Sequence, residues 1–268
     1  MELLLKEIVG EYQHNSCVEG IMLGGSRSTE SEDQLSDYNL YVYLNDVMPV
    51  AERQQITSKF CRYMELNNQF WETQDDGQLN DGSEIVIVYR QLDQFDHQLH
   101  EVAFRHQARL GATTAHWFNF LHAEILFDRQ GKLAQLKQKY TIPYPFALQS
   151  NILQKNHALL RRQMPAYLFK IEKALMRQDR VSLNNLMSRF MASYFDIIFA
   201  VNEKLHPGDK KLVSYALRRC RHIPKNFEAR INRCFELAGG ARQELTAELN
   251  LLIDELDHMI KHRASSSL

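Results

Sequence analysis

GIMLGGSRSTESEDQLSDYNLYVYL, residues 20–44, is the stretch that decides the fold. The apolar run 17–24 is rich in β-formers and stops at a pair of glycines. After a polar segment, apolar and polar residues alternate over 39–46. Such alternation is the period of a half-buried β-strand, whose successive side chains point to opposite faces. The stretch therefore predicts two strands, with a glycine turn at the end of the first.

Gly24, Gly25 and Ser26 predict a turn that binds phosphate. Glycine has no Cβ, so the backbone can turn sharply there and approach a ligand closely. Successive N–H groups beside a serine hydroxyl form a concavity suited to an anion, to which Arg27 can add a charged donor. Taken alone, this pattern also fits a plain turn followed by an ordinary surface charge.

Oxygen-bearing side chains follow at the start of the second strand. Asp37 and Asn39 are two residues apart, so both project from the same face of the strand. Oxygens at that spacing can share a hard cation such as Mg²⁺ that also holds substrate phosphates. A third acid, Glu84, begins another predicted strand, 83–90, and can complete the site. It fits equally well as a solvated residue on the polar face of that strand.

The pattern GGS, nine further residues and then SD opening a strand resembles the DNA polymerase β-type nucleotidyltransferases. More narrowly, the chain resembles the lincosamide and aminoglycoside nucleotidyltransferases of antibiotic resistance and related uncharacterised bacterial proteins. The resemblance covers most of the chain, including DGSEIVIVYR at 81–90 and, more loosely, NEKLHPGDKKL at 202–212. It implies a nucleotidyltransferase domain followed by a helical domain. It also implies a possible homodimer, since dimers are common among the resembling enzymes.

This resemblance also implies a reaction and a role for each matching residue. Gly25 and Ser26 would hold the triphosphate of a nucleotide, and Asp37 would bind Mg²⁺ as the cofactor. Glu84 would accept the proton of a hydroxyl that attacks the α-phosphate, with release of pyrophosphate. The implied enzyme transfers a nucleoside monophosphate, expected to be AMP from ATP, to a small-molecule hydroxyl. The chemistry is mainly positioning and charge stabilisation by the metal.

Three positions leave alternatives open. Lys210 and Lys211 are implied to neutralise phosphate charge, although a charged helix start explains them as well. Asn39 stands where the family has a second acid; its amide oxygen can ligate a metal but brings no charge. Some relatives place an aspartate where this chain has Val86 rather than at Glu84. The chain is therefore an enzyme with an altered metal site or a catalytically silent nucleotide-binding or regulatory module. An antitoxin-like partner of a helical toxin ranks lower, because the chain carries its own helical domain.

The pattern outside this unit predicts an α+β protein: a small mixed sheet followed by an α-helical bundle. In the first half we expect a strand at 123–128 and helices at 1–13, 49–63, 93–109 and 131–139, with turns at the DDG and NDG clusters, 75–77 and 80–82. TIPYPF, with two prolines in four residues, marks the domain boundary. After it we expect helices at 147–177, 180–204, 208–222, 225–238 and 241–262. The predicted domains are 1–142 and 146–262, with a flexible tail at 263–268.

Composition narrows the class of protein. Of the 268 residues 44% are hydrophobic and 24% charged, with a formal net charge of -1, the balance of a globular protein. We therefore expect no nucleic-acid or membrane partner, and the four separated cysteines favour a reducing cytoplasm. The eleven histidines show no metal-binding motif and are interpreted as scattered surface residues. The side chains of Tyr41, Tyr43, Trp71 and Trp117 fit an acceptor pocket or a core equally well.

Overall fold

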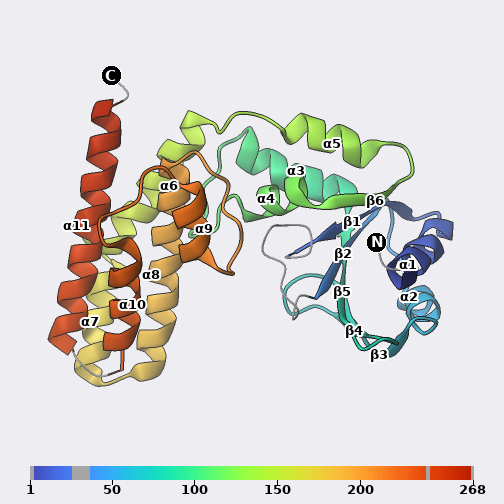
Figure 1. The fold of residues 1–268 in the computed structure, drawn as a ribbon, viewed down its shortest axis with the longest axis horizontal. Helices are drawn as coiled ribbons and strands as arrows, with labels where there is room; N and C mark the ends of the chain where they lie inside the picture. The colour runs from blue at the N-terminus through green and yellow to red at the C-terminus, as the bar shows by residue number, and fades with distance from the viewer. Residues whose placement is uncertain (1–2, 26–36, 240–241, 267–268) are drawn as a thin grey trace. The chain divides into compact units, whose positions relative to one another are not determined.

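The computed structural model describes residues 3–25, 37–239 and 242–266 (Figure 1). The chain divides into two compact units. The first comprises residues 1–101 and 119–142, and the second comprises 102–118 and 143–268. The sequence places the segment 102–118 in the first domain, whereas it groups here with the second unit. The hydrogen bonds described below give the physical reason.

The first unit is built around a six-stranded sheet. Its strands are β1 (Val18–Gly24), β2 (Tyr38–Leu44), β3 (Cys61–Asn68), β4 (Gln74–Leu79), β5 (Glu84–Gln91) and β6 (Glu124–Asp128). Its helices are α1 (Leu3–His14), α2 (Val50–Thr57), α3 (Leu92–Ala103), α4 (Ala115–His122) and α5 (Lys132–Tyr140), of which α3 and α4 each extend into the segment 102–118.

The strand order is β3-β4-β5-β2-β1-β6. β2 and β5 are parallel, while the other neighbouring pairs are antiparallel, so the predicted mixed sheet is confirmed. Because the β3–β4 hairpin lies between β2 and β5 in the chain, the parallel pair is formed by strands that are distant in sequence. This central pair positions the candidate site.

The two faces of the sheet differ as the alternation in β2 predicts. Leu40, Val42 and Leu44 are buried in a core that also contains Leu5 and Ile8 of α1. On the opposite face, Asn39 and Tyr41 are partly buried. The ring of Tyr43 contacts Phe95 of α3 and Phe120 of α4 edge-on. The alternating sequence thus separates an apolar face from a mixed one.

Three predictions for the first unit were wrong, and one helix was not predicted. The helix expected over 49–63 ends at Thr57, and its last residues belong to β3. The DDG cluster lies within β4 rather than in a turn, because Asp75 is fully buried and pairs there with Arg53 of α2. The helix expected to reach 109 ends at Ala103, and α4 was not predicted. In the β3–β4 hairpin, pairing with neighbouring strands overrides the secondary structure that the local sequence prefers.

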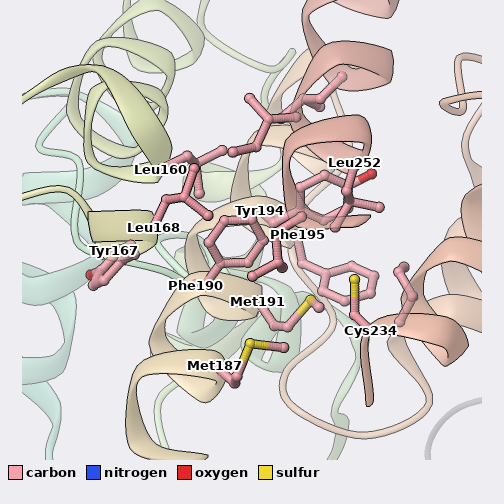
Figure 2. Close-up of a cluster of buried hydrophobic side chains, with 14 of the residues drawn as sticks. Leu160, Tyr167, Leu168, Met187, Phe190, Met191, Tyr194, Phe195, Cys234 and Leu252 are labelled. Carbon is pink, nitrogen blue, oxygen red and sulfur yellow. The ribbon is translucent and has the colours of Figure 1, made fainter. Parts of the chain in front are cut away.

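The second unit is helical. Besides a π-helical turn, η2 (Ala158–Arg162), it contains α6 (Phe146–His157), α7 (Tyr167–Arg177), α8 (Arg180–Val201), α9 (Leu212–Arg219), α10 (Phe227–Leu237) and α11 (Arg242–Ser266). Figure 2 shows part of its core, where Phe190, Tyr194 and Phe195 of α8 lie among side chains of the neighbouring helices. The predicted helical bundle is confirmed.

The helices of this unit differ most from the prediction at three places. The single helix expected over 147–177 is interrupted between η2 and α7, where Pro165 has no backbone N–H to continue the helical hydrogen bonds. α9 begins only at Leu212, instead of directly after Pro207. α11 continues to Ser266, past the expected end at 262. None of the helices within 3–25, 37–239 and 242–266 is long and apolar enough to cross a membrane.

A set of buried hydrogen bonds, here called the polar hub, ties the segment 102–118 to the helical unit. The carboxylate of Asp196 in α8 accepts bonds from the N–H and the hydroxyl of Thr113, at 3.0 and 2.6 Å. Asn156 of α6 accepts a bond from the N–H of Gly111 and donates to Asp196. The Thr114 hydroxyl oxygen accepts a bond from the N–H of His206 at 2.7 Å. These bonds explain why the segment groups with the second unit.

Candidate functional site

The glycine turn predicted from the sequence lies at the end of β1. Gly24 is the last residue of the strand and pairs with Asn39 of β2. Gly25 has φ +78°, a conformation that side chains of other residues disfavour. A Cβ on Gly25 would lie 2.6 Å from Asn39 Nδ2, and one on Gly24 would lie 2.4 Å from Tyr41 Cε2. A side chain at either glycine would therefore have to displace a side chain of β2, and at Gly25 it would also be strained by the positive φ. Ser26 and Arg27 lie outside the described residues.

The two predicted acids come together through the parallel register. Tyr38 pairs with Ile85. The residues that precede them, Asp37 and Glu84, therefore occupy neighbouring positions at the start of the two strands. Neighbouring strands lie about 4.8 Å apart, and alternation directs Asp37, Asn39 and Glu84 to the same face. Glu84 is exposed, and the other two residues are half-buried. The register thus places two carboxylates and one amide at one end of the sheet.

The chemistry of these donors fits a hard cation. Carboxylate and amide oxygens are the ligands that Mg²⁺ takes, commonly from one or two carboxylates together with substrate phosphates. The Asn39 amide nitrogen donates to the Asp37 carbonyl at 3.4 Å, which leaves the amide oxygen as the acceptor. In the described part of the chain no three His, Cys, Asp or Glu side chains form a metal-binding group. A cation here would accordingly rest on Asp37, Asn39 and the substrate, with the Glu84 carboxylate beside it.

Further along the same face, Arg90 forms a set of contacts that was not predicted from the sequence and is here called the arginine clamp. Arg90 of β5 forms two hydrogen bonds to the Glu72 carboxylate, at 2.7 and 2.8 Å. Its guanidinium also stacks over the ring of Tyr41, 4.3 Å from the ring centre. Burial disfavours the charge on Arg90, but Glu72 and the neighbouring tyrosines more than offset it, so the pKa of Arg90 is raised. Burial likewise raises the pKa of Tyr43 to about 12. The clamp fixes the Tyr41 ring against which Gly24 packs.

A second missed residue is Asp76 of β4. It pairs with Val86, the position where some resembling proteins carry an aspartate, and therefore lies on the same face of the sheet as Asn39. Its carboxylate accepts hydrogen bonds from Gln74 Nε2 and Asn68 Nδ2 at 2.9–3.1 Å. Only a correct strand assignment for the DDG cluster could have revealed it, because the cluster by itself is typical of a turn.

The remaining predicted residues lie elsewhere. Lys210 and Lys211 belong to the second unit and are exposed, in the loop that precedes α9. Trp117 is buried in the core, whereas Trp71 is 84% exposed. The prediction that the histidines are surface residues is wrong for His206. It is 1% exposed, and burial lowers its pKa to about 4. Among the described residues, the predicted ones that share one end of the sheet are therefore Gly24, Gly25, Asp37, Asn39 and Glu84.

Comparisons with known proteins give one family match and several similar solved structures. A family described as a domain of unknown function (DUF4037) matches residues 110–212. The chain is similar in structure to a nucleotidyltransferase-like protein from Exiguobacterium sibiricum, with 14% identity, a TM-score of 0.43, and coverage of 97% of this chain and 74% of that one. No curated protein matches the chain.

Two further solved structures are similar over 97% of this chain. One is an aminoglycoside 6-adenyltransferase from Bacillus subtilis, with 9% identity, a TM-score of 0.30 and 89% of its own length covered. The other is the CCA-adding enzyme of Thermotoga maritima in complex with tRNA, with 11% identity, a TM-score of 0.33 and 81% covered. At these identities and TM-scores the activity of the chain has to be argued from its own residues.

Proposed function

We propose that the protein is a nucleotidyltransferase that moves a nucleoside monophosphate, AMP from ATP, to a hydroxyl of a small molecule. The observation that carries this proposal is the parallel β2–β5 register, which places Asp37 beside Glu84. The glycine turn of β1 packs against Asn39 of β2, so this turn and two acids share one end of the sheet. Fold alone would not support the same conclusion, because one fold hosts many activities.

Each residue has a distinct task in the proposed reaction. The backbone at Gly25, with Ser26, holds the triphosphate so that the α-phosphorus faces the acceptor. Glu84 accepts the proton of the acceptor hydroxyl. The hydroxyl oxygen then forms a bond to the α-phosphorus, the bond to the bridging oxygen breaks, and pyrophosphate leaves with the electron pair. Asp37 and Glu84 are exposed enough to reach a ligand, which supports their roles.

A divalent cation belongs to this proposal. Asp37 and Asn39 are the residues that would hold Mg²⁺, and the bound ion would neutralise phosphate charge as it builds up. Lys210 and Lys211 remain candidates for contacts to the same phosphates. We propose no assignment of the acceptor beyond a hydroxyl-bearing small molecule.

The test of the proposal is nucleotide binding by the full-length protein. Isothermal titration with ATP is expected to show binding that strengthens when Mg²⁺ is added, because the two acids need a cation before they tolerate a triphosphate nearby. A Glu84→Gln variant should keep most of this binding but lose the transfer of AMP, since it removes a base and leaves the turn intact. ATP binding that is absent, or that is indifferent to Mg²⁺, would sink the proposal.

A specific observation favours a second candidate function, a silent nucleotide-binding module. The Asn39 side chain packs against Gly25 and donates to the Asp37 carbonyl, so it already serves the structure of the turn. In an enzyme adapted to this arrangement, Asn39→Asp should leave AMP transfer unchanged or lower it. In a silent module that lost only this ligand, the same variant should gain Mg²⁺ affinity and measurable transfer. Assays of AMP transfer by the wild type and by Asn39→Asp, each at the same saturation with ATP, separate the two functions.

A further inference from the structure

The second unit carries a surface depression with a strongly polar lining. Its volume is about 450 Å³, within the range of about 300–1,000 Å³ that is usual for small-molecule sites. One wall is the segment 105–108, and the other is α6. All of its residues belong to the second unit: Arg105, His106, Gln107, Ala108, Asn151, Gln154 and Lys155.

Side chains of α6 hold the first wall in place. Asn151 Nδ2 donates to the carbonyl of His106 at 2.9 Å, and Lys155 Nζ donates to the carbonyl of Ala108 at 2.8 Å. Asn156 continues the series, with a bond to the carbonyl of Arg109 at 2.9 Å. His106 has φ +56°, a conformation that persists in a non-glycine residue only where the surroundings enforce it. The wall is therefore built by specific contacts.

The lining is rich in hydrogen-bond donors and in positive charge. Arg105 and Lys155 are charged, the His106 ring carries an N–H group, and three amide side chains add further N–H groups. No carboxylate occurs among the described residues that line the depression. An arginine guanidinium and several amide groups around one depression suit a ligand that has several oxygen acceptors and negative charge. A phosphate group has both properties, whereas an apolar ligand has neither.

We propose that this depression binds a small phosphate-bearing anion, in a site that is independent of the nucleotidyl transfer argued above. Arg105 and Lys155 supply the charge, and the amides of Gln107, Asn151 and Gln154 supply orienting hydrogen bonds. The polar hub adjoins the site through Asn156 and fixes the segment that follows the wall.

Titration of the full-length protein with pyrophosphate tests this proposal. The experiment uses isothermal titration at low ionic strength with EDTA, so that metal-dependent binding at Asp37 and Glu84 does not contribute. Arg105→Gln is expected to weaken pyrophosphate binding about fivefold, because one charge-assisted contact is lost. Gln154→Glu should weaken it about as much by repulsion, and it leaves the wall's hydrogen bonds from Asn151, Lys155 and Asn156 in place. Added salt should reduce both effects.

Matched variants elsewhere in the same unit control for net charge. Arg177→Gln on α7 and Asn185→Glu on α8 make the same charge changes at exposed positions outside the depression. They should leave binding unchanged, and circular dichroism should show all four variants folded. The proposal is overturned if the control variants weaken binding as much as Arg105→Gln and Gln154→Glu do. It is also overturned if single-stranded RNA binds through these residues while pyrophosphate does not.

Discussion

The two faces of the sheet treat their carboxylates in opposite ways. On the face covered by α1 and α2, Asp75 is fully buried and accepts bonds from Arg53 Nη1 at 3.1 Å and from the Tyr89 hydroxyl at 2.8 Å. On the other face, Asp37 and Glu84 form no ion pair with any residue that the structure describes. The buried acid is compensated within the chain, whereas the two at the sheet's end leave negative charge for a ligand to neutralise. Compensation thus separates a structural acid from a candidate functional one.

The largest effect is expected from breaking the compensated pair. Arg53→Met leaves the Asp75 carboxylate buried without its cation and should lower the free energy of unfolding by about 3–5 kcal/mol. Urea denaturation followed by circular dichroism measures this loss. The matched control is Lys59→Met, which removes an exposed ion pair with Glu11 and should cost at most about 1 kcal/mol. Equal losses in the two variants would contradict the comparison.

A third acid, Asp196, sharpens the comparison because it is buried without a paired cation among the described residues. Burial raises its pKa from 3.8 to about 6, although hydrogen bonds from Thr113 oppose the shift. The folded state therefore retains a proton that the unfolded chain has released, so stability from this group is greatest below pH 4 and is lost as the pH rises to about 6.

The measurement compares wild type with Asp196→Asn, which keeps a donor and an acceptor for Thr113 but cannot ionise. Between pH 4 and 6, the stability of the wild type relative to this variant should fall by about 3 kcal/mol and then stay level. Thermal or urea unfolding at several pH values gives this difference. A difference that does not change with pH would show that Asp196 is already ionised when folded at low pH.

Substitution of an uncompensated acid should change the free energy of unfolding least, while it clearly changes ATP affinity. Asp37→Asn should reduce Mg²⁺-dependent ATP affinity about a hundredfold, on the scale of removing one preorganised electrostatic contact. Its unfolding free energy should change by only about 0.5 kcal/mol, because the side chain has no ion pair to lose. Glu65→Gln, an exposed acid on β3, is the control and should alter neither quantity. If both variants bind ATP as the wild type does, Asp37 belongs with the ordinary surface acids.

Much of the fold could be predicted because its signals are local. Alternation over 39–46 defines β2 and its two faces, and TIPYPF precedes a run of apolar stripes that forms the bundle. The β3–β4 hairpin could not be predicted in this way. CRYMELNN lacks alternation, and DDG is typical of a turn, so only the pairing of β4 with β5 and of Asp75 with Arg53 makes these residues strands.

The residues of the candidate site also fall into those that local sequence predicts and those that only long-range pairing brings in. Gly24, Gly25, Asp37 and Asn39 lie in one continuous stretch, so their proximity follows from two adjacent strands. Glu84 joins them only through the parallel register of β2 and β5, which is a long-range property. The Arg90 clamp depends on Glu72 from the β3–β4 loop, and no periodicity in the sequence reports that contact.

The contrasting burial of the two tryptophans has a spectroscopic consequence. Trp71 is 84% exposed in the loop between β3 and β4, and Trp117 is 1% exposed in α4. Their fluorescence should therefore separate, with one red-shifted emission open to iodide quenching and one blue-shifted emission protected from it. A Trp71→Phe protein would carry a single emitter, placed in the segment that the polar hub anchors. Its emission would follow the opening of that anchor during unfolding without any added label.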